Sequence, residues 1–195
     1  EITNEKVGHS GTLDPFAEGV LVLGTGKDTK KLTKITNDDK SYLATIQLGA
    51  TTDTLDIESK IIKKKEIPIL NKNVIENVLK SFLGESAQTP PMYSAKKING
   101  KKLYDLARKN ISVKRTPTNI TIKNIELLEF KCPFIRFSVT CTKGTYIRVL
   151  GNDIAEKLGT VGYLVRLIRT RVGEHLIQDS KTIENFRDSW KSFEY

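Results

Sequence analysis

One glycine-rich segment carries residue types suited to nucleophilic or acid–base chemistry. It reads Gly8-His-Ser-Gly-Thr-Leu-Asp14-Pro-Phe-Ala-Glu-Gly19, so a histidine and a carboxylate share one short stretch. Pro15 disfavours helical angles at Asp14, and the glycines permit angles that side chains penalise, so we expect a rigid, non-helical loop presenting the carboxylate. The simpler alternative is a turn in which Asp14 binds nearby amides. The glycine spacing does not match a nucleotide-phosphate loop.

A second candidate segment lies where the clearest strand pattern meets a helix pattern. It reads Cys141-Thr-Lys-Gly-Thr-Tyr-Ile-Arg148. Gly144 allows a tight turn, and we predict Thr145 as the helix N-cap, with Tyr146 and Arg148 in the first turn. An arginine here can bind a carboxylate from elsewhere with two parallel hydrogen bonds, which hold it and balance its charge. The alternative is that Tyr146 packs and Arg148 is solvated.

Basic residues gather in further segments. Between residues 88 and 109, six positive charges alternate with Tyr93 and Tyr104, a composition typical of RNA binding. A lysine stripe follows residues 27–34, and an arginine group follows residues 166–171. A solvated lysine face is the ordinary alternative for each stripe alone, but together they favour nucleic acid. The cations that we expect to contact RNA are Lys96, Lys97, Lys101, Lys102, Arg108, Lys143 and Arg169.

The composition agrees with a polyanion partner. The 195 residues include 32 Lys and Arg against 23 Asp and Glu, a net charge of +9. No apolar run approaches the roughly 20 residues that cross a bilayer, so we expect no membrane association. Two cysteines, Cys132 and Cys141, are too few for disulfides to stabilise a chain of this length, which indicates reduced thiols and a cytoplasmic protein. The two histidines and two cysteines form no ligand cluster, so we expect no metal.

Strand and helix patterns alternate along the chain. Alternating apolar residues predict strands at residues 41–48 and 135–142, and a third from residue 120 with a bulge near 123–124. Apolar residues three and four apart predict helices at 75–82 and 147–158, and a short basic helix at 29–36 capped by Asp28. We therefore predict an α+β fold in which helices and loops flank a mixed, mainly antiparallel sheet.

These segments together resemble the tRNA pseudouridine-55 synthases of the TruB type. The resemblance is carried by ordered blocks that read GHSGTLDPFAEGVLVL, KSYLATIQLGATTDTLD, QTPPMYSAKKINGKKLYDLARKN, CTKGTYIRVLGNDIAEKLG and LVRLIRTRVG. It implies the pseudouridine synthase fold, with a long mixed sheet and neither metal nor cofactor. Members of the family convert a uridine in the T-loop of tRNA to its C-glycoside isomer, so the implied partner is the T-arm and elbow of tRNA.

The resemblance also implies roles for individual residues. Asp14 matches the catalytic aspartate, and Arg148 matches the partner that holds it. Tyr42 matches the aromatic residue that stacks on the flipped base, and Tyr146 matches the tyrosine against the uracil. The remaining residues with implied substrate contacts are His9, Leu167 and Lys30.

The resemblance has limits that bear on domain organisation. Family members carry about 35 residues before the glycine-rich loop, and many carry a small C-terminal RNA-binding domain of the PUA type. We expect residues 1–195 to form one catalytic domain without these parts, acting as a monomer. A second enzymatic interpretation is a guide-RNA-dependent relative. We favour a stand-alone enzyme over it, because the Gly100-Lys-Lys-Leu-Tyr104 block resembles the stand-alone form. An RNA-binding module without catalysis is the non-enzymatic alternative. The sequence does not choose between aspartate attack on the base and removal of the 2′ proton.

Overall fold

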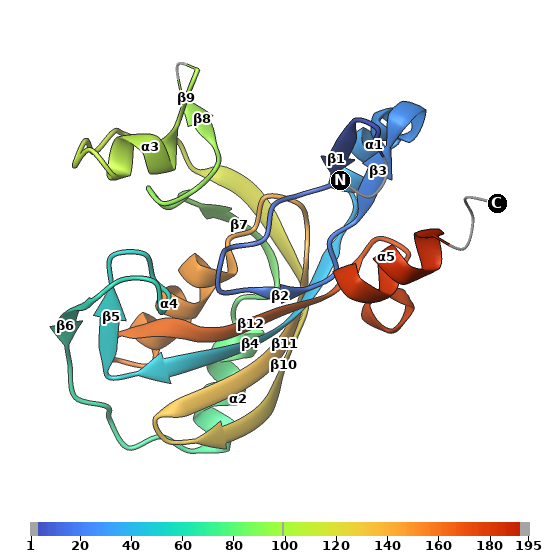
Figure 1. Ribbon diagram of the computed structural model, residues 1–195. Helices are drawn as coiled ribbons and strands as arrows, with labels where there is room; N and C mark the ends of the chain where they lie inside the picture. The colour runs from blue at the N-terminus through green and yellow to red at the C-terminus, as the bar shows by residue number, and fades with distance from the viewer. Residues whose placement is uncertain (1–3, 99, 192–195) are drawn as a thin grey trace.

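A seven-stranded sheet forms the centre of the computed structural model, which describes residues 4–98 and 100–191 (Figure 1). Its strand order is β13-β12-β4-β11-β10-β7, and β2 adds to β12. Only the β2–β12 pair is parallel. The strands are β2 (Glu18–Gly19), β4 (Lys40–Leu48), β7 (Gly84–Gln88), β10 (Thr118–Lys131), β11 (Phe134–Cys141), β12 (Gly162–Val172) and β13 (His175–Leu176). This arrangement confirms the predicted α+β fold with a mixed, mainly antiparallel sheet.

Alternating side chains give the sheet one buried face. In β4, Ala44, Ile46 and Leu48 are buried and alternate with partly exposed residues, as the sequence pattern predicts. Ile46 lies opposite Ile135 of β11 and opposite Leu164 of β12, so the three central strands stack their apolar residues in register. The predicted bulge is confirmed, because the β10–β11 register shifts between residues 122 and 124.

Two helices cover this face. Helix α2 (Lys72–Lys80) begins where the Asn71 side chain accepts a hydrogen bond from the Val74 amide. Helix α4 (Ile147–Lys157) packs against β12 so closely that a Cβ on Gly162 would lie 2.7 Å from the Cβ of Ala155. Both helices occupy the predicted segments, and their apolar stripes complete the core.

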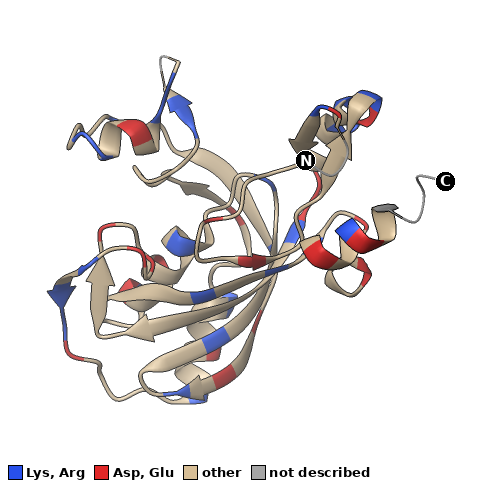
Figure 2. Cartoon of the chain, in the orientation of Figure 1, with Lys and Arg blue, Asp and Glu red and all other residues tan. Residues whose placement is uncertain are grey.

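Two projections rise from the same side of the sheet (Figure 1). One consists of β1 (Val7–His9), β3 (Leu23–Thr25), η1 (Gly26–Lys30) and α1 (Leu32–Thr36), and the other of β8 (Lys97–Ile98), β9 (Lys101–Lys102) and α3 (Leu103–Ala107). The predicted helix at 29–36 is therefore two short helices. Asp28 lies inside η1 and pairs with Lys31 at 2.8 Å, so its predicted capping role is wrong. Figure 2 shows Lys and Arg on both projections.

The remaining elements lie at the margins of the sheet. Strands β5 (Ala50–Thr52) and β6 (Ile61–Lys64) form a small separate sheet, and η2 (Ile177–Asp179) and α5 (Ile183–Lys191) follow β13. Among residues 4–98 and 100–191, no helix combines the length and apolar character needed to cross a bilayer.

Candidate active site

The glycine-rich loop runs from β1 to β2 and carries Asp14 between the two projections. A turn in which the Ala17 amide donates to the Asp14 carbonyl, at 2.9 Å, fixes the backbone beside the carboxylate. The loop then leaves along the sheet, because β2 pairs with β12 in parallel. The Asp14 side chain is 32% exposed, so part of the carboxylate faces the open side of the sheet.

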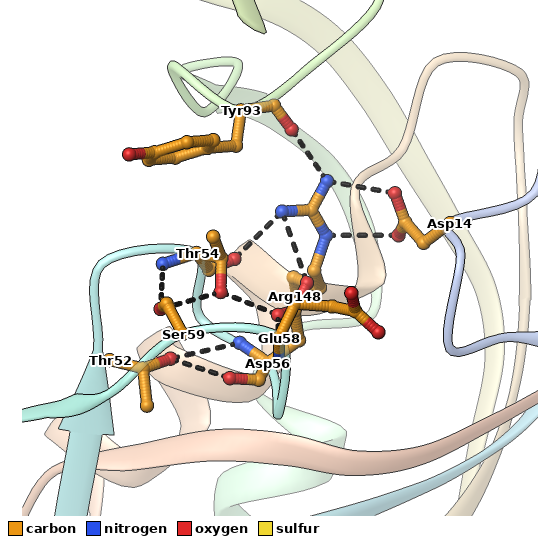
Figure 3. Close-up of polar contacts among 8 residues, drawn as sticks. All are labelled: Asp14, Thr52, Thr54, Asp56, Glu58, Ser59, Tyr93 and Arg148. Atoms are coloured by element: carbon orange, nitrogen blue, oxygen red, sulfur yellow. Dashed lines mark hydrogen bonds and ion pairs between the residues drawn. The ribbon is translucent and has the colours of Figure 1, made fainter. Parts of the chain in front are cut away.

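Arg148 binds the Asp14 carboxylate along one edge (Figure 3). Its Nε donates to Asp14 Oδ2 and its second terminal nitrogen donates to Asp14 Oδ1, both at 2.9 Å. Two parallel charge-assisted bonds fix both the position and the rotation of a carboxylate. The sequence predicts this pairing type, and the structure brings these two predicted residues together.

The remaining donors of Arg148 are held by groups that sequence reasoning missed. They donate to the backbone carbonyls of Thr54 and Tyr93, each at 2.7 Å, while the Tyr93 ring points away (Figure 3). The Asp56 carboxylate lies 3.5 Å from the same guanidinium, and the Arg148 and Asp56 side chains are only 4% and 3% exposed. A buried cation therefore lies between two carboxylates, one buried and one open to solvent.

A compact turn holds Asp56 in place. Its Oδ1 accepts hydrogen bonds from the Thr54 hydroxyl and from the Glu58 amide (Figure 3). The Thr52 hydroxyl donates to the Asp56 carbonyl at 2.7 Å and accepts from the Asp56 amide at 3.1 Å. The only signal in the sequence is the run Thr-Thr-Asp-Thr-Leu-Asp at 51–56, and its other aspartate, Asp53, is exposed. Burial alone distinguishes the two, so spacing could not have selected Asp56.

Tyr42 lies in β4 beside the loop. Burial raises the pKa of Tyr42 to about 12; the Asp14 charge adds to the shift, while a hydrogen bond from Arg169 opposes it. The predicted stacking residue therefore lies close enough to Asp14 for the two to interact electrostatically. A phenol with so high a pKa stays neutral at physiological pH, which suits a stacking surface.

Tyr146 lies just before α4, two residues from Arg148. The helix begins at Ile147, with Tyr146 as the N-cap residue and no side-chain cap, so the predicted cap at Thr145 is wrong. The Thr145 hydroxyl donates instead to the Thr142 carbonyl at 2.9 Å. Gln88, at the end of β7, accepts from the Tyr146 amide at 2.8 Å and donates to the Tyr146 carbonyl at 3.1 Å. Gln88 is buried and was not singled out from the sequence.

The other implied substrate contacts occupy different environments. Leu167 is buried in the core cluster on β12, whereas His9 and Lys30 are exposed on the projection formed by β1, β3, η1 and α1. The Gly11 amide donates to His9 Nδ1 at 3.3 Å, which leaves Nε2 as the protonated ring nitrogen when the side chain is neutral.

The predicted RNA-binding cations separate into two groups. Lys96, Lys97, Lys101, Lys102 and Arg108 lie on the projection of β8, β9 and α3, and Lys143 is exposed near the start of α4. Arg169 is 3% exposed and its guanidinium binds backbone carbonyls, so it does not join this surface. Lys102 and Arg108 lie 5.2 and 5.4 Å from the centre of the Tyr104 ring. Tyr104 therefore makes cation–π contacts with basic residues of its own projection.

No three or more His, Cys, Asp or Glu side chains lie together in a way that could hold a metal ion within the described part of the chain. The centre of the candidate site is the Asp14 carboxylate, held by the Arg148 guanidinium. A fixed carboxylate of this kind can supply a nucleophile or a base.

Comparison with known proteins shows the family of this chain. Residues 1–147 match the family model described as TruB family pseudouridylate synthase, N-terminal domain. The chain belongs to the TruB family. It is 45% identical over 181 residues to the tRNA pseudouridine synthase B of Phocaeicola vulgatus, covering 93% of this chain and 77% of that relative. It is 44% identical to the enzyme of the same name from Clostridium kluyveri, covering 100% of this chain and 66% of that relative.

Solved structures also place this TruB family member in the pseudouridine synthase fold. A chain from the crystal structure of a Cbf5-Nop10-Gar1 complex matches with a TM-score of 0.72 and 28% identity, covering 96% of this chain and 46% of the other. A chain from an H/ACA RNP bound to a substrate RNA containing 2′-deoxyuridine matches with a TM-score of 0.67 and 25% identity, at 96% and 46% coverage. The matched fold therefore extends beyond residues 1–147 to nearly the whole chain.

Proposed function

We propose that this protein isomerises uridine 55 in the T-loop of tRNA to pseudouridine, with Asp14 as the essential carboxylate. The observation that carries the proposal is the two-bond pairing of Asp14 with the buried Arg148, which leaves the other edge of the carboxylate free. The names of the similar proteins support the substrate and the product. The stand-alone form is favoured because the chain is 45% identical to a tRNA pseudouridine synthase B and 28% identical to the matching chain of the Cbf5-Nop10-Gar1 complex.

The reaction breaks the bond between N1 of uracil and C1′ of ribose and forms a bond from C5 to the same C1′. C5 loses a proton and N1 gains one, so the product has the same atoms as the substrate. Asp14 can serve in two ways: as a nucleophile adding to C6, or as a base that takes the 2′ proton to give a glycal-like intermediate. Both routes need a fixed, open carboxylate edge.

The detached uracil has to turn without escaping. Tyr42 offers a neutral aromatic face beside Asp14, and Leu167 closes the site from β12. Tyr146 lies two residues before Arg148, at the start of α4, and we assign it to the uracil ring on the family resemblance. Water exclusion by such walls protects a reactive intermediate.

The substrate base must first leave its stack, at a cost of a few kcal/mol. His9 is exposed near the loop and can occupy the vacated place. Both projections carry Lys and Arg (Figure 2), which can bind the phosphate backbone, and we therefore expect RNA affinity that falls steeply with salt.

The test is release of tritium from uracil C5 in an unmodified T-arm transcript, comparing wild type with Asp14→Asn. We expect stoichiometric release by the wild type, none by the variant, and equal RNA affinity for both. Gel-shift titration and thermal unfolding verify that the variant binds and folds. Release by Asp14→Asn at the wild-type rate would overturn the catalytic assignment. No release by a folded wild type that binds the RNA would favour a binding module instead.

A further inference from the structure

Arg169 of β12 lies where the end of the glycine-rich loop pairs with the central sheet. On one side it is the register partner of Tyr42 in β4, and on the other it is the register partner of Gly19 in β2. The approach of β2 is so close that a Cβ on Gly19 would lie 2.2 Å from the Arg169 carbonyl oxygen. One residue thus contacts both the stacking tyrosine and the end of the loop that carries Asp14.

The hydrogen bonds of Arg169 close the loop at two points. Its carbonyl accepts from the Val20 amide at 2.8 Å, and its Nε donates to the Val20 carbonyl at 2.7 Å. A terminal nitrogen donates to the Gly11 carbonyl at 3.0 Å. Gly11 and Val20 bracket Asp14 in the sequence, so the guanidinium ties together the two ends of the segment that presents the carboxylate.

A phosphate-binding arginine would have a different environment. Arg169 is 3% exposed, whereas Arg166, three residues earlier on the same strand, is exposed to solvent. The planar guanidinium donates in several fixed directions, which a lysine ammonium on a flexible stem does not reproduce. Its Nε and one terminal nitrogen donate to the loop carbonyls of Val20 and Gly11.

We propose that Arg169 is a positioning residue that fixes the catalytic loop, and with it Asp14, in register with Tyr42. This inference rests on the proposed isomerase function. It assigns Arg169 to the geometry of the reaction and removes it from the cations that determine RNA affinity. A displacement of about 1 Å in a reacting group can cost roughly 100-fold in rate.

The experiment compares Arg169→Met, Arg169→Lys and the matched exposed control Arg166→Met. The readouts are the single-turnover rate of tritium release at saturating enzyme, RNA affinity at several salt concentrations, and hydrogen exchange of the Val20 and Ser10 amides. We expect both Arg169 variants to lose roughly 100-fold in rate, with faster exchange at Val20 and an unchanged salt slope. Arg166→Met is expected to keep the wild-type rate once RNA is bound.

Two results would overturn the inference. One is a loss of affinity with a salt slope reduced by about one, which is the signature of a phosphate contact. The other is full activity in Arg169→Lys, which would show that a positive charge alone suffices at this position. Arg169→Lys keeps the charge and approximate length of the side chain, so it also tests the inference if Arg169→Met does not fold. Absence of release by the wild type would reject the proposed function separately, and Val20 exchange would still test the loop closure.

Discussion

Asp14 and Arg148 are 134 positions apart in the chain and yet share two hydrogen bonds of 2.9 Å. Arg148 also faces the buried Asp56 at 3.5 Å, so its single charge balances one partly exposed carboxylate and one buried carboxylate. The buried pair orients the guanidinium, and the guanidinium orients the exposed carboxylate. The site is therefore assembled from the core outward.

Removing the cation is expected to destabilise the fold as well as the site. Arg148→Met leaves Asp56 buried without its partner, so we expect a loss of about 3 kcal/mol or more in the free energy of unfolding. Asp56→Asn should lower the free energy of unfolding by less than Arg148→Met does. The variant that combines both substitutions should lose less than the sum of the two single losses, because it leaves no uncompensated charge at position 56. Urea unfolding measures all three. Lys123→Met, which breaks an exposed pair with Asp39, is the control and should cost under about 1 kcal/mol.

The Gln88 side chain is expected to control the placement of Tyr146. Gln88→Leu removes both hydrogen bonds to the Tyr146 backbone and leaves its amide without a partner, at about 1–3 kcal/mol. We expect slower tritium release with unchanged RNA affinity, measured by single turnover and gel shift. Gln47→Leu removes one bond to Tyr163 and is the control. A rate equal to that of the control would contradict the role of Gln88.

A side chain at position 19 is expected to separate the loop from the sheet. Gly19 has φ +106° and no room before the Arg169 carbonyl, so Gly19→Ala combines backbone strain with a collision. We expect a loss of about 1–3 kcal/mol in stability and a slower reaction. Gly84→Ala has a similar φ of +95° but open space around it. Thermal unfolding should therefore show Gly19→Ala as the more destabilised of the two.

The stability of α4 is expected to depend on pH through Asp153. Burial, followed by the charge of Glu156, raises the pKa of Asp153 to about 6 from an ordinary 3.8. The folded state therefore binds this proton more tightly than the unfolded state. The resulting stabilisation is complete below pH 3.8 and is lost as the pH rises through about 6.

Replacing Asp153 with Asn should remove this pH dependence. We expect Asp153→Asn to gain on the order of 1 kcal/mol over wild type at about pH 8, after discounting for partial exposure, and much less at about pH 5. Urea unfolding at the two pH values measures the difference. Glu66→Gln, at an exposed carboxylate, is the control. A gain that is equal at both pH values would rule out titration of Asp153 as its cause.

Local patterns in the sequence determined most of the secondary structure. Strands at 41–48 and 135–142, the bulge near 123 and the two core helices are confirmed, because alternation and helical spacing report burial of one face. The residue types at positions 14, 42, 146 and 148, read with the family resemblance, marked the candidate site. These signals lie within short stretches of the chain, where the spacing of apolar residues is sufficient to predict a strand or a helix.

Only the tertiary structure decided which groups complete the site. The predicted cap at Thr145 is wrong because the helix begins one residue later and the Thr145 hydroxyl donates to the Thr142 carbonyl. The Tyr146 amide is bound instead by Gln88, from a strand far away in the sequence. Asp56 and the Tyr93 carbonyl reach Arg148 through sheet register and loop packing, and no spacing rule encodes them. Arg169 looks like one more surface cation in the sequence, but its side chain is buried where β2 pairs with β12 and the loop carbonyls of Gly11 and Val20 accept its hydrogen bonds. The sequence determines which residues are charged, whereas the hydrogen-bond or ion-pair partner of each charged residue depends on how distant segments pack.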